Sequence, residues 1–335
     1  MKVSFLIIAY NAEETLEAVF KDLINQDYPH ELMEVILVDG SSTDKTKIIM
    51  QEFAKQDNGF IRVEVKDNPK RTLPSGWNVA LASVQGDIVL KVDAHASIPD
   101  DFVSKNVRCI KSGEKICGGQ RPNIIDEETP WKRTLLIAES SMFGSSIAPY
   151  RRNAGKTYVK SLFHAAYSKE VFDKVGGFNE SLVRTEDNEI HYRMRQAGYK
   201  FCFDPEIISY QHTRNSLKKM LKQKYANGYW IGRTSKVCPQ CLSIFHFVPF
   251  AFIIAIIIST ILLGMGIKFV AITLWSAYWL AAIFMSIVSI VKEKFSISLL
   301  ILPILFFLLH MSYGIGTSIG IVEVYYEKMR KRKHE

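Results

Sequence analysis

The sequence has few cysteines, and they follow no pattern. Five of them stand among 335 residues, at positions 109, 117, 202, 238 and 241. A disulfide framework would show more regular spacing, and disulfides persist mainly in oxidising compartments. The cysteine content therefore favours a reducing setting for the polar part of the chain.

The N-terminus lacks a long apolar run. Only about six apolar residues precede Glu13 and Glu14, whereas the apolar core of a secretory signal peptide takes ~7–15 residues. Internal repeats and low-complexity linkers are also absent from the sequence. We therefore expect the first part of the chain to remain in the cytoplasm.

Charge is nearly absent from residues 242–322. The charged residues of this region are Lys268, Lys292, Glu293 and Lys294. Its apolar residues form three segments, at 242–265, 269–291 and 297–322. Each segment has the ~20 residues that a helix needs to cross the hydrocarbon core of a bilayer. Three such segments in succession argue against buried core helices, so we expect a multi-pass membrane region.

The net charge of +8 is concentrated beside this region. One basic group precedes it, namely Lys218, Lys219, Lys222, Lys224, Arg233 and Lys236. A second group follows it, namely Lys328, Arg330, Lys331, Arg332 and Lys333. Basic residues beside membrane segments attract anionic lipid head groups, whereas nucleic-acid interfaces interleave them with exposed aromatics. We expect the lipid bilayer as a partner and no nucleic acid, with an interfacial helix at 216–236 and a basic tail at 323–335.

The number of membrane spans poses a difficulty. Three spans would place the basic tail on the side opposite the N-terminal part, against the positive-inside tendency. One segment is therefore a candidate for a re-entrant or interfacial position. Pro303 and the series Gly314, Gly316 and Gly320 point to the third segment.

Up to about residue 236 the chain alternates between strand and helix patterns. Apolar runs at 3–9, 34–38, 61–65 and 87–92 predict buried parallel strands. Helical spacing follows the first three runs, and it returns at 187–196 before an extended stretch at 200–210. This alternation predicts an α/β fold with an open, mostly parallel, Rossmann-like sheet. In such sheets ligands bind beyond the carboxyl ends of the strands.

Two carboxylates stand at such ends. Asp39 follows Val-Ile-Leu-Val and opens the loop to Asp44. An ionised aspartate is only an acceptor, so Asp39 can bind the N3–H group of a uracil, although it can equally serve as a turn former or helix N-cap. Asp93 follows Ile-Val-Leu-Lys-Val and suits a divalent metal that bridges a diphosphate.

Further segments complete an ordered series. In chain order they are SFLIIAYN (4–11), VDGSSTD (38–44), GWN (76–78), GDIVLKVDAH (86–95), GGFN (176–179) and ED (186–187). This series resembles family 2 glycosyltransferases of GT-A fold, in particular the bacterial exopolysaccharide (succinoglycan-type) branch, over about residues 2–215. The resemblance implies a GT-A catalytic domain at 1–236, followed by the α-helical transmembrane region at 242–322.

The resemblance also implies a role for each matching residue. The nucleotide-sugar site would contain Asp39 on the uracil, with Ala9, Asn11, Arg71, Asn78 and Asp93. Asp187, beside Glu186, would be the general base that deprotonates the acceptor hydroxyl. Attack from the face opposite the leaving diphosphate would invert the anomeric configuration. Taken alone, the two acids are also typical of the first turn of a helix.

The chain departs from the family pattern at the metal site. His95 replaces the second aspartate of the DXD motif that Asp93 begins, and His212 matches a position where related enzymes supply a further metal or phosphate contact. We expect a divalent cofactor, Mn²⁺ or Mg²⁺, held by Asp93, His95 and His212. Imidazole suits Mn²⁺ better than Mg²⁺, and a lone histidine such as His212 can also be structural.

Together these features imply an inverting, hexosyltransferase-type enzyme. It would move a sugar from a nucleotide diphosphate sugar, with a UDP-sugar expected, to a polyprenol-diphosphate-linked saccharide in exopolysaccharide or capsule assembly. Residues 211–215 lack the tryptophan of the processive Gln-x-x-Arg-Trp signature, so we expect non-processive transfer. Transfer to polyprenyl monophosphate and a non-catalytic, nucleotide-binding membrane scaffold remain as alternatives.

Overall fold

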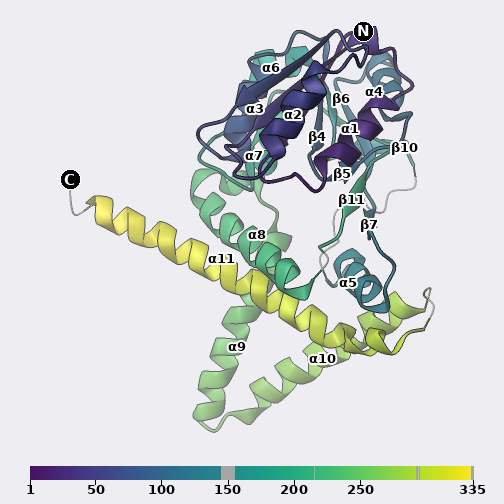
Figure 1. Cartoon of the computed structure of the whole chain (residues 1–335). Coiled ribbons are helices and arrows are strands. Elements are labelled where there is room, and N and C mark those ends of the chain that lie inside the picture. The colour runs from purple at the N-terminus through teal and green to yellow at the C-terminus, as the bar shows by residue number, and fades with distance from the viewer. Residues whose placement is uncertain (145–154, 215, 292, 294, 333–335) are drawn as a thin grey trace. The chain divides into compact units, whose positions relative to one another are not determined.

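The structure is a computed structural model that describes residues 1–144, 155–214, 216–291, 293 and 295–332 (Figure 1). The chain divides into two compact units. The first contains residues 1–122 and 148–212, and the second contains residues 123–147 and 213–335. The stretch 216–236, expected at the end of the catalytic domain, therefore packs within the C-terminal unit.

Among the described residues, an eight-stranded sheet forms the centre of the first unit, in the order β3-β2-β1-β4-β9-β6-β10-β8. Its strands are β1 (Val3–Ala9), β2 (Met33–Asp39), β3 (Arg62–Asp67), β4 (Ile88–Asp93), β6 (Ile116–Gln120), β8 (Thr157–Val159), β9 (Ala166–Ser168) and β10 (Phe201–Ile208). The neighbours β3, β2, β1 and β4 are parallel, and β9 runs antiparallel between β4 and β6. The predicted mostly parallel sheet is confirmed.

Helices cover both faces of this sheet (Figure 1). On one face lie α1 (Leu16–Ile24), α2 (Thr46–Lys55) and α4 (Phe102–Lys111). On the other lie α3 (Leu73–Leu81), α6 (Lys169–Val175) and α7 (Glu186–Gln196). In β1, Phe5 and Ile7 face the first group, whereas Leu6 and Ile8 face the second. This two-sided burial explains why β1 is apolar at nearly every position.

The alternation of side chains positions two charged residues of β4. Leu90 and Val92 pack in the core on the α1 side, and Val89 packs in the core on the α3 side. Because successive side chains of a strand point to opposite faces, Lys91 and Asp93 share the face of Val89. They therefore point toward the side of the sheet that α3 and α7 cover.

Helices dominate the second unit. Its elements are β7 (Asn123–Ile124), α5 (Pro130–Ser140), α8 (Leu217–Val237), the short 3-10 helices Pro239–Cys241 and Ile244–Phe247, α9 (Val248–Gly264), α10 (Lys268–Ile290), the 3-10 helix η5 (Ile297–Ile301) and α11 (Leu302–Arg332). Within the described residues, three helical segments are long and apolar enough to cross a membrane, at Ile244–Gly264, Lys268–Ile290 and Ile297–Arg330. The predicted apolar segments are thus helical.

The third segment is a continuous helix past its predicted end. α11 runs on through residues 323–332, which the sequence suggested as a tail, and residues 333–335 lie outside the described residues. Pro303 stands in the first turn, where its missing N–H group costs no hydrogen bond. Gly316 and Gly320 also lie within the continuous helix. Both pack closely against α8.

Candidate active site

The ends of β1 and β2 bring Ala9 and Asp39 side by side. The two residues are register partners in the parallel pair, and the Gly40 N–H group donates to the Ala9 carbonyl oxygen at 2.8 Å. Asp39 is buried, and its two carboxylate oxygens accept from the Ser42 N–H group at 3.2 and 3.3 Å. The turn after β2 is thus held by its own aspartate at the carboxyl edge of the sheet.

Asn11 joins the loop after β1 to this turn. Its backbone N–H group donates to Ser42 Oγ at 3.0 Å, and its Oδ1 atom accepts from the Thr43 N–H group at 2.9 Å. Asn11 adopts a φ of 49°, in the left-handed region that asparagine tolerates. The structure therefore brings Ala9, Asn11 and Asp39 together, and their role in a nucleotide site stays a prediction.

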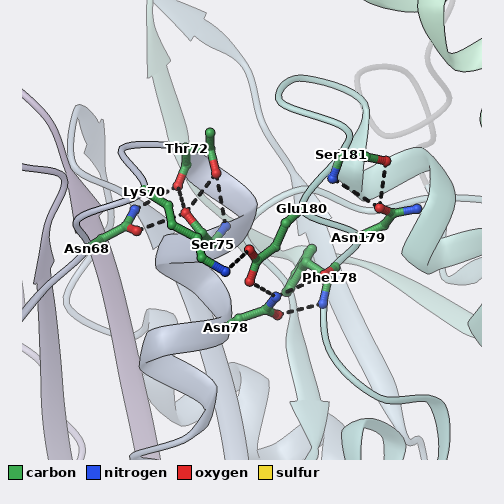
Figure 2. Close-up of polar contacts among 9 residues, drawn as sticks. All are labelled: Asn68, Lys70, Thr72, Ser75, Asn78, Phe178, Asn179, Glu180 and Ser181. Carbon is green, nitrogen blue, oxygen red and sulfur yellow. Dashed lines mark hydrogen bonds and ion pairs between the residues drawn. The ribbon is translucent and has the colours of Figure 1, made fainter.

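Arg71 lies on a neighbouring loop. The Asn68 N–H group donates to the Asp39 carbonyl oxygen at 2.8 Å, and the Arg71 N–H group donates to the Asn68 carbonyl oxygen at 3.1 Å. Lys70 pairs with Glu180 at 2.7 Å (Figure 2). Arg71 is exposed, and its predicted contact with the base or phosphate stays a prediction.

Asn78 faces the turn at 177–180. Its Nδ2 atom donates to the Phe178 carbonyl oxygen at 2.9 Å and to Glu180 Oε1 at 3.0 Å, and its Oδ1 atom accepts from the Phe178 N–H group at 2.7 Å (Figure 2). A Cβ atom at Gly177 would lie 2.4 Å from that Oδ1 atom. In the structure Asn78 fastens this turn to α3, and its predicted contact with the nucleotide sugar stays a prediction.

A cavity of about 460 Å³ lies next to this turn. It is lined by Asn78 and Phe178 together with residues from the C-terminal half of α3 and from α6. Asp39, Asp93 and Asp187 are not among its lining residues. This cavity is therefore separate from the carboxylate-bearing edge of the sheet.

Asp187, the predicted base, is paired with a buried lysine. The Lys91 Nζ atom lies 2.5 Å from Asp187 Oδ1. The same ammonium lies over the rings of Trp77 and Phe178, 4.7 and 5.1 Å from their centres. Burial alone would lower the pKa of Lys91, but the negative charge of Asp187, together with its hydrogen bond, outweighs burial and raises that pKa. A charged lysine therefore fixes the position of the Asp187 carboxylate at the end of β4.

Glu186 is the more buried of the two adjacent acids. Its side chain is nearly inaccessible, and its Oε2 atom has no hydrogen-bond partner among the described residues. Burial, followed by the charge of Asp187, raises the pKa of Glu186 to about 8 against the opposing charge of Lys91. Glu186 is thus protonated at neutral pH, beside an ion-paired Asp187.

Asp93 is held by two cationic or potentially cationic neighbours. His164 Nε2 lies 3.2 Å and an Arg121 terminal nitrogen 3.9 Å from Asp93 Oδ2. Burial acts to raise the pKa of Asp93, but the close approach of His164, with the charges of His95 and Arg121, lowers it well below the ordinary value. Asp93 therefore remains an ionised carboxylate at the strand end.

The predicted metal ligands do not form a cluster in the structure. His95 lies in the turn after β4, and the Nε2 atom of His212 lies 2.8 Å from Ser97 Oγ, where β5 (Ala96–Ser97) pairs with β11 (Tyr210–His212). Among the described residues, no group of three or more His, Cys, Asp or Glu side chains is arranged to hold a metal. Asp93 suits a divalent cation by its charge and its oxygen atoms, and the donor diphosphate would have to supply further ligands.

No role in the site was predicted from the sequence for three residues of this region, Lys91, Arg121 and His164. Lys91 had a visible signal, because it is the one charge inside the apolar run of β4. Arg121 stacks 3.5 Å above the centre of the Phe163 ring and hydrogen-bonds Gln211, and His164 Nδ1 lies 2.9 Å from Ser209 Oγ. These partners are distant in sequence, so no local pattern marks them.

Known proteins are similar to this chain over much of its length. The dolichyl N-acetyl-alpha-D-glucosaminyl phosphate 3-beta-D-2,3-diacetamido-2,3-dideoxy-beta-D-glucuronosyltransferase of Methanococcus voltae is 27% identical over 328 residues, which cover 96% of this chain and 97% of that protein. The succinoglycan biosynthesis protein ExoA of Rhizobium meliloti is 29% identical over 205 residues, or 59% of each chain.

The solved structure of a mannosyltransferase from Pyrobaculum calidifontis, in complex with GDP-Man and Mn²⁺, has a TM-score of 0.58 at 17% identity. The likeness covers 96% of this chain and 87% of that one, and it shows that the GT-A-type fold is shared. Residues 4–176, about half of the chain, match the family described as Glycosyl transferase family 2. The chain belongs to this family and is a glycosyltransferase.

Proposed function

We propose that this enzyme is an inverting, non-processive glycosyltransferase that moves a sugar from a UDP-sugar to a polyprenol-linked saccharide at the cytoplasmic face of the cell membrane. The observation that best supports this proposal is the gathering of three carboxylates at one edge of the sheet. Asp39 and Asp93 end the strands on either side of β1. Asp187 lies near the same edge because it pairs with Lys91, which precedes Asp93 by two residues in β4.

The donor site would lie along the edge formed by β2, β1 and β4. Asp39 would accept a hydrogen bond from the uracil N3–H group, with Ala9 and Asn11 shaping the pocket and Arg71 contacting base or phosphate. Asp93 would hold a divalent metal together with oxygens of the donor diphosphate. When bound, that metal would supply Lewis-acid stabilisation of the charge that develops on the leaving diphosphate.

Asp187 would act as the general base. Its carboxylate would take the proton of the acceptor hydroxyl while the hydroxyl oxygen attacks the anomeric carbon from the side opposite the diphosphate, which inverts the configuration. Lys91 would keep the carboxylate oriented before the acceptor arrives. Glu186, protonated beside it, would add no second negative charge to the site.

The proposed acceptor follows from the membrane region and from a relative. An acceptor on a long polyprenol stays in the bilayer, so membrane attachment of the enzyme raises its effective concentration. The name of the Methanococcus voltae relative, similar over 97% of its length, describes transfer to a dolichyl phosphate that already carries a sugar. This favours a lipid-linked saccharide over bare polyprenyl monophosphate as acceptor.

A donor screen with membranes containing the full chain tests the proposal. UDP- and GDP-sugars would be supplied with Mn²⁺ or Mg²⁺ and with polyprenyl monophosphate, or with a saccharide on polyprenyl mono- or diphosphate, and the extracted lipids analysed by mass spectrometry. The expected result is one sugar added from one UDP-sugar to a lipid-linked saccharide. A sugar added to bare polyprenyl monophosphate would contradict the proposed acceptor, and no consumption of any donor would contradict the proposed reaction.

A further inference from the structure

Two helices of the second unit pack closely along their lengths. α8 and α11 meet through Gly228 and Gly232 of α8 and Gly316 and Gly320 of α11. A Cβ atom at any of these positions would lie between 2.0 and 2.5 Å from a backbone oxygen of the other helix. Glycine is therefore required for this approach, which is closer than helices with larger interface residues achieve.

The contacts advance in the same direction along both helices. Ser312 Oγ donates to the Leu221 carbonyl oxygen at 3.0 Å, and farther along Arg233 pairs with Glu323 at 3.1 Å and with Glu327 at 2.9 Å. The two helices therefore run parallel and side by side (Figure 1). Each part of α11 between Ser312 and Glu327 therefore lies at the same distance from the bilayer centre as the part of α8 that it contacts.

The composition of α8 limits that depth. Lys218, Lys219 and Lys222 are exposed on its first turns. Exposed ammonium groups are strongly disfavoured in the hydrocarbon core. Ser312, at the middle of the apolar stretch 302–322, contacts Leu221, the neighbour of Lys222. The part of α11 that would reach the bilayer centre in a spanning helix thus lies beside a lysine-bearing turn.

The first half of α11 also packs against a charged helix. Leu305, Phe306 and Leu309 share a buried cluster with Leu135 and Ala138 of α5. The α5 helix begins with surface ion pairs, in which Lys132 binds Glu127 at 2.7 Å and Arg133 binds Glu128 at 3.1 Å. α11 therefore has a polar helix beside it over both halves of its length. Its first half also contacts α9 and α10, since the Phe307 ring packs against the rings of Phe252 and Trp279.

The exposed apolar residues of α11 fall on one stripe. They are Ile304, Ile315, Ile319, Val322, Tyr326 and Met329, with Tyr325 exposed at the edge of the stripe. After Ile304 their spacing is three or four residues, and Ile304 itself lies three turns before Ile315 on the same face. An apolar stripe on one side, with charged partner helices on the other, is typical of a helix that lies in the membrane interface.

We propose that α8 and α11 lie together on the membrane surface and that only the hairpin of α9 and α10 crosses the bilayer. The partner of this pair of helices is an anionic lipid surface. Lys222 and Lys236 are exposed on α8, which packs beside the helix that carries the apolar stripe. The turn at 265–267 sends the chain back to the side on which it entered. The end of α11, with Lys328 and Arg330, then lies on the same side as α8, as the positive-inside tendency requires.

Cysteine accessibility in sealed membrane vesicles tests this topology. The full chain would carry one substitution at a time, Lys222→Cys on α8, Met265→Cys at the tip of the hairpin or Lys328→Cys near the end of α11, all exposed positions. A membrane-impermeant maleimide is the probe, added before or after permeabilisation. The native cysteines are all buried, so the unsubstituted chain gives the labelling background. Labelling does not require catalysis, so its outcome is separate from that of the donor screen.

The expected result is that Lys222→Cys and Lys328→Cys react from the same side and Met265→Cys from the opposite side. Reaction of Lys328→Cys together with Met265→Cys would show that α11 crosses the bilayer and would overturn the proposal. Reaction of all three variants from one side would show that the α9–α10 hairpin does not cross the bilayer and would also overturn the proposal.

A depth measurement gives a second, independent test. A fluorophore would be attached at Ile304→Cys, Ile315→Cys or Tyr326→Cys and quenched by lipids labelled near the head group or deep in the acyl chain. An interfacial α11 puts all three probes at similar, shallow depths. A clear maximum of depth at Ile315, with shallow positions at both other sites, would contradict the proposal.

Discussion

The Lys91 ammonium lies 2.5 Å from the Asp187 carboxylate and joins residues that are 96 positions apart in the chain. Lys91 comes from the central strand β4, and Asp187 comes from the first turn of α7. The pair is largely buried, with side-chain exposures of 7% and 19%. A buried ion pair whose partner is removed leaves an uncompensated charge, so the proposed base depends on this lysine for its position.

Replacement of this lysine tests the dependence. Lys91→Met keeps the length and apolar contacts of the side chain and removes its charge. We expect the transfer rate to fall about 10²-fold, because a displacement of about 1 Å in a reacting group has this effect, while donor binding persists. Steady-state transfer and nucleotide binding would be measured on the same membrane preparations.

The matched control is Lys105→Met. Lys105 pairs with Asp101 one turn away on the surface of α4, and surface pairs of this kind contribute about 0.5 kcal/mol or less. We expect near wild-type transfer from it. Equal rates for Lys91→Met and Lys105→Met would contradict a positioning role for Lys91.

Asp187→Asn tests the base itself. Asparagine keeps the size of the side chain but cannot accept the acceptor proton, so we expect transfer to fall by about 10²–10⁴-fold. Nucleotide binding should survive, since Asp187 is not in the loops that hold Asp39. Asp57→Asn, at an exposed position, serves as the control. Transfer near the wild-type rate by Asp187→Asn would show that another group is the base.

Glu186 predicts a pH dependence of stability. Its pKa in the folded chain, about 8, lies above the ordinary value of 4.5. Between these values the folded chain keeps a proton that the unfolded chain has released. Its contribution to stability is thus complete below the lower value and is lost as the pH rises to the higher one. Glu186→Gln cannot ionise and should not show this loss.

The measurement is the thermal unfolding midpoint in detergent across this pH range. We expect Glu186→Gln to gain in midpoint relative to the wild type as the pH rises from about 5 to about 8. The difference between the two proteins cancels the titration of all other groups that they share. A difference that stays constant over this range would contradict the raised pKa of Glu186.

Metal removal tests the role of the strand-end site. We expect chelation of divalent cations to lower transfer, and Mn²⁺ to restore more of it than Mg²⁺, because an imidazole near Asp93 suits Mn²⁺ better. His95→Asp should move this preference toward Mg²⁺ by supplying a second carboxylate. Restoration by both metals in the same ratio for the two proteins would show that His95 does not take part in metal binding.

The contact between α8 and α11 predicts a stability difference between two glycines. A Cβ atom at Gly320 would lie 2.2 Å from the Tyr229 carbonyl oxygen, whereas one at Gly264 would meet nothing within 4 Å. Gly320→Ala should destabilise the chain by about 1–3 kcal/mol, as overpacking does. Gly264→Ala should be neutral or slightly stabilising, because alanine is the better helix former. Unfolding midpoints in detergent compare the two, and equal midpoints would contradict this packing.

The regular part of the sheet could be predicted because burial imposes a local pattern. The run predicted at 3–9 is β1 (Val3–Ala9), and the run predicted at 87–92 is within one residue of β4 (Ile88–Asp93). The short strand β9 (Ala166–Ser168) was not predicted, since three residues are too few for a recognisable period. β9 pairs with β4 and β6, and such non-local pairing leaves no local sequence signal.

The candidate site was predictable to a similar extent. Asp39 and Asp93 followed from the rule that ligands bind at the carboxyl ends of parallel strands, and the structure places both there. The pairing of Lys91 with Asp187, and of Arg121 and His164 with Asp93, depends on which distant side chains meet. Asn78 is the counter-example, because its tripeptide motif did not reveal that its amide binds the turn at Phe178.

The parallel packing of α8 and α11 also has a consequence for biosynthesis. Leu221 meets a partner that is made 91 residues later, which at about 5–20 residues per second is a delay on the order of ten seconds. During that interval the glycine-bearing side of α8 remains uncovered while the ribosome completes α9 and α10. A messenger truncated before codon 312 would therefore yield a chain without the part of α11 that packs against α8. In that chain the glycine-bearing side of α8 would remain exposed to quality-control proteases.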